Sequence, residues 1–173
     1  MSEPRDAAQP AEPTSDRPEL PPTYGVDRAA TAGLLPWSYV GEHMASARNY
    51  WVATTRPDGR PHVSPVWGLW LDGTFYFSSD PTSRKGRNLA ARPEAAVHLE
   101  SGDDVVIVEG TIERVADAGT LARFADDYDT KYAIRLDLTD PNYAVYRLRP
   151  RAAYAWEERT FPQSMTRWRF NRP

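Results

Sequence analysis

The sequence has no cysteine, only two lysines among its 21 cationic residues (Lys85 and Lys131), and no long apolar run. The missing cysteine excludes disulfide scaffolds, thiolate catalysis and zinc sites built from cysteine. A membrane-spanning helix needs about 20 consecutive apolar residues, and no segment comes near that length. The first residues also lack the basic-then-apolar order of a secretion signal. We therefore expect a cytoplasmic protein that does not act at a membrane.

Charge is nearly balanced, with 24 acidic and 21 basic residues and a formal net charge of −3. Such a chain has no general attraction for nucleic acid, so we expect no nucleic-acid partner and only local recognition of phosphate. His43, His62 and His98 are scattered without a second set of ligands, so no metal site is predicted. Dinucleotide, Walker and nucleophile-elbow motifs are all missing. The sequence therefore gives no support to a dinucleotide-binding fold, a nucleotide hydrolase or an esterase.

The first 22 residues hold six prolines, and Leu20 is their only large aliphatic side chain. Such a segment cannot bury enough apolar surface to offset the entropy lost on ordering. We predict a disordered, proline-rich tail over residues 1–30. The remaining residues, 31–173, are sufficient for one domain with its own core.

Apolar periodicity and turn residues predict the elements of this domain. Two turn signals stand out, the stretch 56–60 (RPDGR) and the pair Asp72-Gly73, each between strand-like runs. The predicted helices cover residues 36–48, 82–92 and 117–128. The predicted strands cover residues 50–55, 60–71, 74–78, 95–101, 105–115, 143–148 and 152–158, the last two as a hairpin around residues 149–151. Neighbouring strands in hairpins with few helices predict a mainly β (α+β) protein, a closed or nearly closed antiparallel barrel with peripheral helices.

The stretch SRKGRNL coincides with the start of a predicted helix. Asp80 is expected to cap this helix and Pro81 to occupy its first position, which leaves the amides of residues 82–84 without intrahelical partners. Ser83, Arg84 and Lys85 could then bind an anion together with these amides. The alternative is a solvated basic helix face. Cations in a first helical turn are unfavourable without an anion, which favours the binding site.

At this point the chain resembles the pyridoxamine 5′-phosphate oxidase-like split-barrel flavoproteins, a superfamily that includes deazaflavin-dependent reductases. The resemblance covers roughly residues 35–170. The segments that carry it are RPDGRPHVSPVW, the Asp-Gly hairpin, FYFSS, SRKGRNLAARPEAAV and VVIVEGTIERV. Each segment is weak evidence alone, but their order and spacing together are specific.

The resemblance implies a cofactor whose phosphate and ring are held by different elements. It implies that Ser83, Arg84 and Lys85 bind the phosphate, with Ser78 and Ser79 nearby and Asn88 at the polar tail. The ring would lie along a strand, near His62, Ser64, Pro65, Val66 and Trp67. It also implies a homodimer with the cofactor between subunits, in which Trp168 contributes to the partner's site.

The resemblance leaves two cofactors open, FMN and the deazaflavin coenzyme F(420). The flavin oxidases of the superfamily carry an arginine-to-lysine pattern on the second strand, whereas this chain has Pro-Val-Trp at residues 65–67 and no lysine there. This difference favours F(420). The function expected is an oxidoreductase that passes hydride to a small organic acceptor, with no side chain assigned as catalytic. An FMN-dependent oxidase or reductase, or a non-catalytic cofactor carrier, is the alternative.

Overall fold

A computed structural model describes residues 13–170 of the chain. Within this range the helices are α1 (Trp37–Ser46), α2 (Arg84–Ala91) and α3 (Ala118–Tyr132), with short 3-10 turns η1 (Pro22–Tyr24) and η2 (Glu158–Thr160). The strands are β1 (Thr14–Asp16), β2 (Asn49–Thr55), β3 (Pro61–Leu71), β4 (Thr74–Ser79), β5 (Glu94–His98), β6 (Asp104–Arg114), β7 (Ala144–Glu157) and β8 (Thr166–Arg169). No helix of the described residues is long and apolar enough to cross a membrane.

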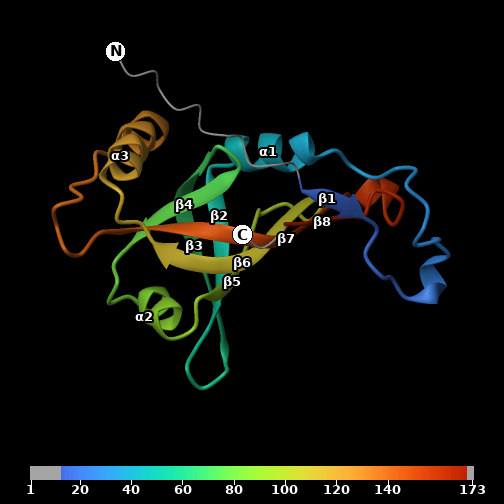
Figure 1. The fold of residues 1–173 in the computed structure, drawn as a ribbon, viewed down its shortest axis with the longest axis horizontal. Coiled ribbons are helices and arrows are strands. Elements are labelled where there is room, and N and C mark those ends of the chain that lie inside the picture. Colours follow the sequence, from blue (N-terminus) through green and yellow to red (C-terminus); the bar gives the residue numbers. More distant parts are fainter. Residues whose placement is uncertain (1–12, 171–173) are drawn as a thin grey trace, which may run out of the picture.

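Six strands close into an antiparallel barrel (Figure 1). They follow the order β7-β4-β3-β2-β5-β6, and the pairing of β6 with β7 closes the ring. The second half of β7 pairs with β8, and β8 pairs with β1, so these two strands extend the sheet beyond the barrel. The predicted split β-barrel with peripheral helices is confirmed.

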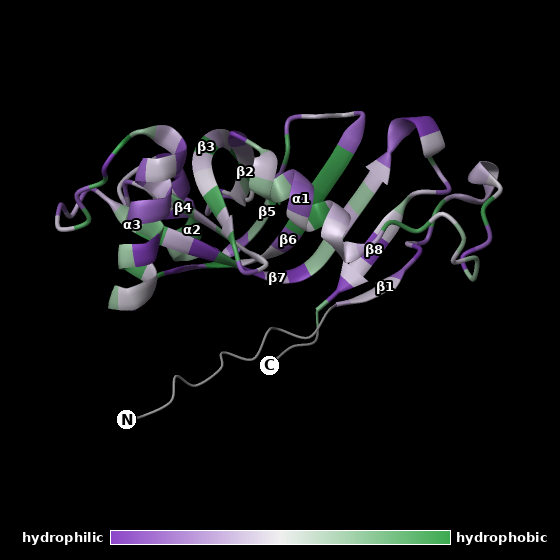
Figure 2. Ribbon diagram, turned by 90° about the horizontal axis from the view of Figure 1, so that it is seen from above, coloured by the Kyte–Doolittle hydropathy of each residue, from purple (hydrophilic) through white to green (hydrophobic). Residues whose placement is uncertain are grey.

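The apolar side chains form two packed clusters, one on each face of the sheet. The larger fills the barrel and includes the fully buried Tyr50, Phe75 and Phe77. The smaller lies between α3 and the barrel's outer surface, where Phe124 packs with Leu69 among others. Figure 2 shows α3 with both polar and hydrophobic segments, as expected of a helix that covers a sheet with one side.

Both predicted turns are present, and local residue chemistry explains them. In the turn after β2, the Arg56 amide donates to the Arg60 carbonyl at 2.9 Å, and Gly59 has φ +87°. Between β3 and β4, Asp72 and Gly73 have φ +49° and +76°. Positive φ at both central residues matches the twist of a two-residue hairpin, which favours Asp-Gly.

The predicted hairpin around residues 149–151 is wrong, because β7 runs without a break for 14 residues. Pro150 lies opposite Gly110, beside a bulge in β7 where Arg151 is the extra residue between the pairs Glu109–Ala152 and Gly110–Pro150. A bulge is one of the few places where a strand accepts proline. A Cβ at Gly110 would stand 2.0 Å from the Arg149 carbonyl oxygen, so glycine lets the two strands approach here. Strand β6 pairs with β7 on both sides of Pro150, so β7 continues as one strand.

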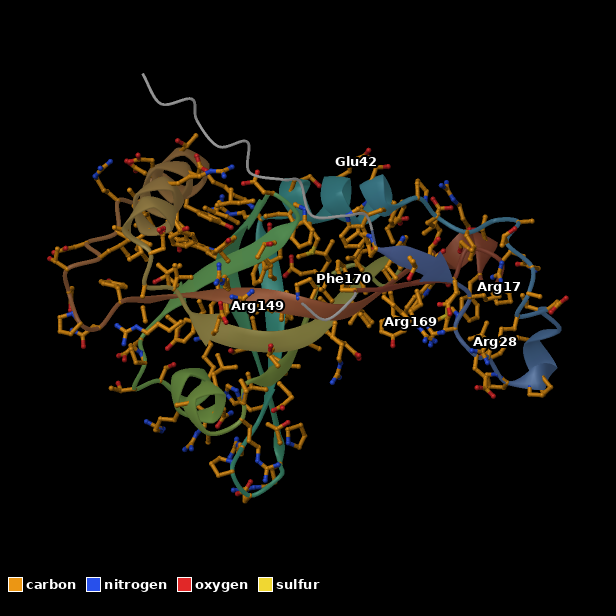
Figure 3. The ribbon with its side chains drawn as sticks, viewed as in Figure 1. Arg17, Arg28, Glu42, Arg149, Arg169 and Phe170 are labelled. Atoms are coloured by element: carbon orange, nitrogen blue, oxygen red, sulfur yellow. The ribbon has the colours of Figure 1, made fainter. Side chains whose placement is uncertain are left out.

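The predicted tail over residues 1–30 also needs correction. Residues 1–12 lie outside the described range, but β1 pairs in register with β8 from Thr14 to Asp16. Arg17 is 2% exposed and donates to the carbonyls of residues 30, 32, 162 and 163 at 2.8–3.2 Å. It lies near η2 at the end of the molecule that holds β1 (Figure 3). Charged hydrogen bonds at one guanidinium therefore order a segment with little apolar surface.

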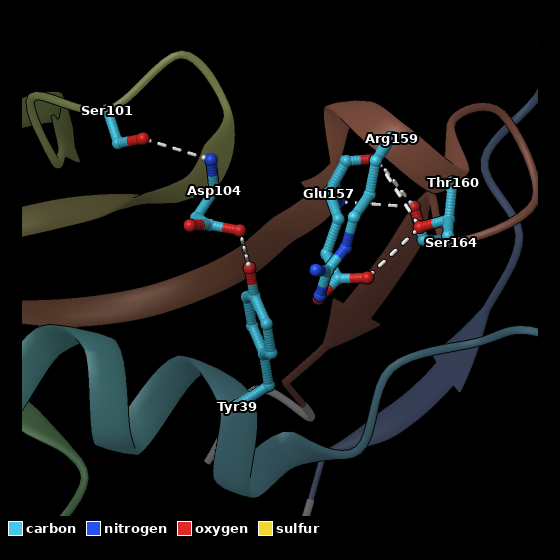
Figure 4. Close-up of polar contacts among 7 residues, drawn as sticks. All are labelled: Tyr39, Ser101, Asp104, Glu157, Arg159, Thr160 and Ser164. Carbon is cyan, nitrogen blue, oxygen red and sulfur yellow. Dashed lines mark hydrogen bonds and ion pairs between the residues drawn. The ribbon is translucent and has the colours of Figure 1, made fainter.

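A polar network joins α1 to the loop between β5 and β6 (Figure 4). Tyr39 Oη donates to the Asp104 carboxylate at 3.4 Å, and the Asp104 amide donates to Ser101 Oγ at 2.9 Å. Partial burial first, and then the charge of Asp104, raise the pKa of Tyr39 to about 12. Nearby, Ser164 Oγ accepts from the Glu157 amide at 3.1 Å. The Tyr39 contact ties α1 to the start of β6, and the Ser164 contact holds the end of β7 against the turn that follows it.

Candidate functional site

The first half of β3 has one unpaired edge. Residues 61–67 pair with β2, whereas only residues 68–71 pair with β4. No strand of the described residues covers the β4 side of residues 61–67. Pro61 and Pro65 lie in this half, and proline is tolerated on a strand edge because no hydrogen bond needs its missing N–H. The barrel is therefore split beside β3.

Gly68 shows which backbone groups face the open edge. It follows the last residue paired with β2, and its amide donates to Tyr132 Oη at 3.0 Å while its carbonyl accepts from Lys131 Nζ at 3.1 Å. These α3 side chains replace β2 as partners on that side. Successive strand residues direct their backbone groups to opposite edges. Val63 and Trp67 therefore present N–H and C=O groups to the open edge, and Pro65 presents its C=O.

Strand alternation divides the predicted ring-contact residues between two faces. Val66 lies opposite Tyr50 in the barrel core, and His62 lies opposite Thr54 on the same face. Ser64 shares that inner face. Pro65 and Trp67 point outward. The expected set of five therefore surrounds the strand rather than lining one wall.

An open cleft of about 480 Å³ lies on the outer face of β2 and β3, within the usual range for small-molecule sites. The residues that line it are Asn49, Trp51, Pro65, Val66, Trp67 and Glu100. The Trp67 ring stacks on Tyr132 of α3, with centroids 4.9 Å apart and planes 5° apart. The cleft therefore brings together three of the predicted residues and has a rigid aromatic wall.

Helix α2 begins later than predicted. Ser83, not Asp80, caps it, because Ser83 Oγ accepts from the Gly86 amide at 3.1 Å. The Asp80 carboxylate instead accepts from the Thr82 amide at 2.6 Å. A Cβ at Gly86 would stand 2.4 Å from the Pro81 carbonyl oxygen, so this tight turn needs glycine. The amides of Arg84 and Lys85 remain without intrahelical partners at the helix start.

Cations converge on this helix start from two elements. Burial, followed by the charges of Arg56, Lys85 and Arg84, lowers the pKa of His62, which places these three cations around the histidine. Burial also lowers the pKa of Lys85. Within residues 13–170, none of the three cations forms an ion pair with an acidic side chain. An anion would neutralise this cluster. The residues present therefore fit a phosphate group.

Arg56 was missed by the sequence analysis, which treated it only as part of a turn. Its Nε is buried and has no acceptor among the described residues. Only the fold brings Arg56 and Lys85 near the same histidine, His62, so the position of Arg56 in the sequence carried no signal. We refer to Arg56, Arg84 and Lys85 as the phosphate cluster.

The neighbouring polar groups are only partly satisfied. Ser79 Oγ lies 3.2 Å from Ser83 Oγ, and the Asn88 amide donates to Thr54 Oγ1 at 2.9 Å. Asn88 Oδ1 and Ser64 Oγ are buried and have no partner in the described part of the chain. Buried polar atoms without partners are rare and often mark a ligand or an ion. These atoms leave unused hydrogen-bonding capacity on the inner face of β3, the same face as His62.

Two predicted site residues lie elsewhere. Ser78 faces the opposite side of β4 from Ser79, opposite Val145 of the outer apolar cluster, and its Oγ is buried without a described partner. Trp168 is 1% exposed and packs on Trp37 in the barrel core, with ring centroids 5.5 Å apart. A buried ring cannot reach a partner's site, so that role of Trp168 is corrected. Its strand pairs with both β7 and β1, which sequence alternation could not reveal.

The last turn of α3 was also missed, because the predicted helix ended at residue 128. In the structure it continues to Tyr132 and ends at Ala133, which has φ +56°. This extra turn supplies Lys131 and Tyr132 to β3. Lys131 Nζ donates to Tyr50 Oη at 2.9 Å as well as to Gly68. Burial, with a smaller effect of Arg48, lowers the pKa of Lys131 to about 8.

Lys131 predicts a rise in stability as the pH increases from about 8 to about 10. Its pKa is about 8 in the folded protein and 10.5 in the reference state, so the unfolded chain binds more protons in this window. The window ends before the ordinary pKa of tyrosine, about 10. Urea unfolding at several pH values should show a rising midpoint in the native chain and a flatter profile in Lys131→Met. Equal slopes in the two proteins would contradict this assignment.

Among residues 13–170, no three His, Asp or Glu side chains are grouped so as to hold a metal ion. The fold and the site together define a split-barrel protein with a phosphate cluster at one end of an open strand edge and an aromatic cleft beside it. Residues 42–157 match the family described as pyridoxamine 5′-phosphate oxidase. The chain belongs to the pyridoxamine 5′-phosphate oxidase family.

Individual relatives agree with this membership. A pyridoxine/pyridoxamine 5′-phosphate oxidase of Gluconobacter oxydans is 30% identical over 143 residues, which cover 64% of this chain and 71% of that protein. A protein of the same name from Azorhizobium caulinodans is 43% identical over 77 residues, 43% of this chain, and the match spans only 36% of its length.

Solved structures share the fold. A conserved hypothetical protein of Mycobacterium tuberculosis has a TM-score of 0.65 at 23% identity, covering 77% of this chain and 91% of that one. An F(420) reductase has a TM-score of 0.54 at 25% identity, covering 69% of this chain and 98% of that one. Both likenesses support the split barrel.

Proposed function

We propose that this protein is an oxidoreductase that uses reduced coenzyme F(420) to transfer hydride to a small organic acceptor. The observation that carries the proposal is the open edge of β3, which has the phosphate cluster at one end and the cleft beside the other. From His62 to Trp67 the strand extends about 17 Å at about 3.3 Å per residue. A tricyclic ring joined by a five-carbon chain to a phosphate is of that order of length.

In this proposal the bound deazaflavin supplies the hydride chemistry, and the protein binds and orients it. Arg56, Arg84 and Lys85 hold the phosphate by charge-assisted hydrogen bonds. The open-edge backbone groups of Val63 and Trp67 pair with polar atoms at the rim of the ring. The aromatic wall formed by Trp67 excludes water from one side of the cleft. Catalysis then depends on how the protein positions the cofactor and the acceptor relative to each other, and no acid or base is required from the chain.

Two observations favour F(420) over FMN. The β3 residues that line the cleft, Pro65, Val66 and Trp67, are all without charge, so this stretch has no lysine for a flavin tail. An F(420) reductase is also among the similar structures. FMN remains the alternative because relatives named as pyridoxine/pyridoxamine 5′-phosphate oxidases match this chain. A non-catalytic cofactor carrier is the third candidate function, since no acid-base pair lines the cleft.

Titration of tryptophan fluorescence with F(420) and FMN separately tests the proposal. Trp51 and Trp67 line the cleft, so a ring bound there should quench them. We expect saturable quenching with tighter binding of F(420), and a smaller response in Trp67→Phe than in the control Trp156→Phe. Tighter FMN binding would favour the alternative cofactor, and no response to either would overturn both. Binding without turnover of quinones, enones or nitro compounds would favour a carrier.

We also propose a homodimer with the cleft at its interface. Val63 is 52% exposed on the outer face of β3, beside the apolar wall of the cleft. Exposed apolar side chains around an open cleft are typical of a protein interface. A second copy seated on this face would enclose the cleft and give two equivalent sites. A monomer by light scattering in the presence of cofactor would contradict it.

A further inference from the structure

The guanidinium of Arg48 stands at the end of the cleft away from the phosphate cluster. Its Cζ lies 5.4 Å from the centroid of the Trp67 ring and 5.5 Å from that of Tyr132. The two rings stack on each other 4.9 Å apart, so the cation and the rings form a nearly equilateral triangle. Trp67 lines the cleft, and Arg48 directly precedes Asn49, which also lines it. Cation–π attraction to two rings holds this side chain beside the cleft.

The hydrogen-bonding groups of this guanidinium are unused. Among residues 13–170, its nitrogens donate to no acceptor and meet no carboxylate within ion-pair distance, whereas its backbone carbonyl accepts from Tyr132 Oη at 2.7 Å. Lys131 contacts one of these two rings as well, with its amine 5.3 Å from the Tyr132 centroid. Two cations therefore share the Tyr132 ring without a described counter-ion. Arginine is suited to bind carboxylate or phosphate through two parallel bonds.

The lining of the cleft also includes an acidic side chain. Glu100 lines the cleft, and its carboxylate accepts from the Asn49 amide at 3.3 Å. A ligand with an acidic group would be repelled from Glu100 and attracted to Arg48. The cleft therefore has charges of both signs close to it, which can orient a ligand as well as attract it.

We propose that Arg48 is a second anion-binding residue, which receives a carboxylate or phosphate group of the ligand that occupies the Trp67 end of the cleft. This inference rests on the proposed function for its ligand, because the phosphate cluster already accounts for one anionic group about 17 Å away along β3. The second anion is then an acidic group on the electron acceptor, because the glutamate carboxylates of F(420) are joined to the ring through the phosphate and extend away from the ring.

A first experiment tests the anion site without any cofactor. Nicotinate and nicotinamide are nearly isosteric and differ in charge, so their dissociation constants from the free protein report on a cation at the cleft. We expect nicotinate to bind about tenfold more tightly, the order of one charge-assisted hydrogen bond. Arg48→Gln should remove this preference and leave nicotinamide binding unchanged. Arg151→Gln, an exposed site on β7, is the control of equal charge.

Outcomes that contradict the proposal are defined in the same assay. Equal binding of the two ligands by the native chain would overturn it, as would a preference that survives in Arg48→Gln. A loss of nicotinamide binding in the variant would indicate a displaced Trp67 rather than a lost anion contact, and would also count against it. Glu100→Gln should strengthen nicotinate binding, because it removes the opposing charge.

A second experiment tests the acceptor as the source of the anion. Arg48→Gln should leave the binding of F(420) and FMN unchanged, because both cofactors carry their negative charges at the phosphate end. The variant should raise KM by about tenfold only for carboxylated members of matched acceptor pairs. An unchanged KM for these acceptors would overturn the proposal. Failure of the native chain to bind either cofactor would contradict the proposed function alone, since the nicotinate assay does not depend on it.

Discussion

The double variant Arg84→Gln/Lys85→Gln is expected to weaken cofactor binding by 100-fold or more. Each side chain contributes charge-assisted hydrogen bonds worth about 1.5–3 kcal/mol, and about 1.4 kcal/mol corresponds to a tenfold change. The half-buried Lys85 adds to this, because its lowered pKa shows a charge that burial disfavours and a bound anion would stabilise. The loss should therefore be large even though the two residues lie at a helix end near solvent.

Fluorescence titration with F(420) and FMN measures this effect, and both cofactors should be weakened because both carry a phosphate. The control is Arg28→Gln/Arg151→Gln, which removes the same formal charge at exposed positions away from α2. Raising the salt concentration should weaken native binding more than binding by the double variant. Near-normal affinity of the double variant for both cofactors would contradict the phosphate-cluster assignment.

Trp168→Ala is expected to lower the free energy of unfolding by about 3–5 kcal/mol, the usual cost of truncating a buried tryptophan. This is a large share of the 5–15 kcal/mol that stabilises typical domains. The ring is 1% exposed and packs on Trp37, with little space to relax around the cavity left behind. Urea denaturation should show the loss as a lower midpoint with little change in slope.

Trp168→Phe provides the matched comparison, since it keeps an aromatic ring and should lose much less stability. Trp51→Ala serves as a second control, because this ring is only partly buried at the cleft. The sequence analysis assigned Trp168 to a partner subunit's site. A stable Trp168→Ala variant with selectively weakened cofactor binding would restore that assignment and refute the core position.

Features that depend on neighbouring residues could be predicted from the sequence. The Asp72-Gly73 hairpin needs only two residues that accept positive φ, and the alternation along β3 needs only a period of two. The start of α2 was harder, because Asp80 and Ser83 are both good caps. Packing at Gly86 selects Ser83, since the chain turns tightly against Pro81. That packing contact cannot be recognised from the residue pattern alone.

The parts of the site that could not be predicted arise from contacts between distant segments. Arg56 and Arg48 flank β2 and look like ordinary surface cations in the sequence. Folding brings Arg56 near His62 together with two cations of α2, and the unpredicted last turn of α3 brings Tyr132 to Arg48. Strand β7 was divided in two because proline usually interrupts a strand, and only pairing with the remote strand β6 on both sides of the bulge at Arg151 keeps β7 continuous past Pro150. Long-range pairing thus decided each of these cases.

The open edge of β3 has a further consequence for solubility. An unpaired strand edge is a template on which another chain can add, and it is a common starting point for aggregation. Here Pro61 and Pro65 remove two of the amide donors that an incoming strand would need, and they interrupt any continuous ladder. A small ligand can still form single hydrogen bonds with the remaining backbone groups of the edge, such as those of Val63 and Trp67. The prolines therefore leave the edge open to a small ligand while protecting the protein from self-assembly into extended sheets.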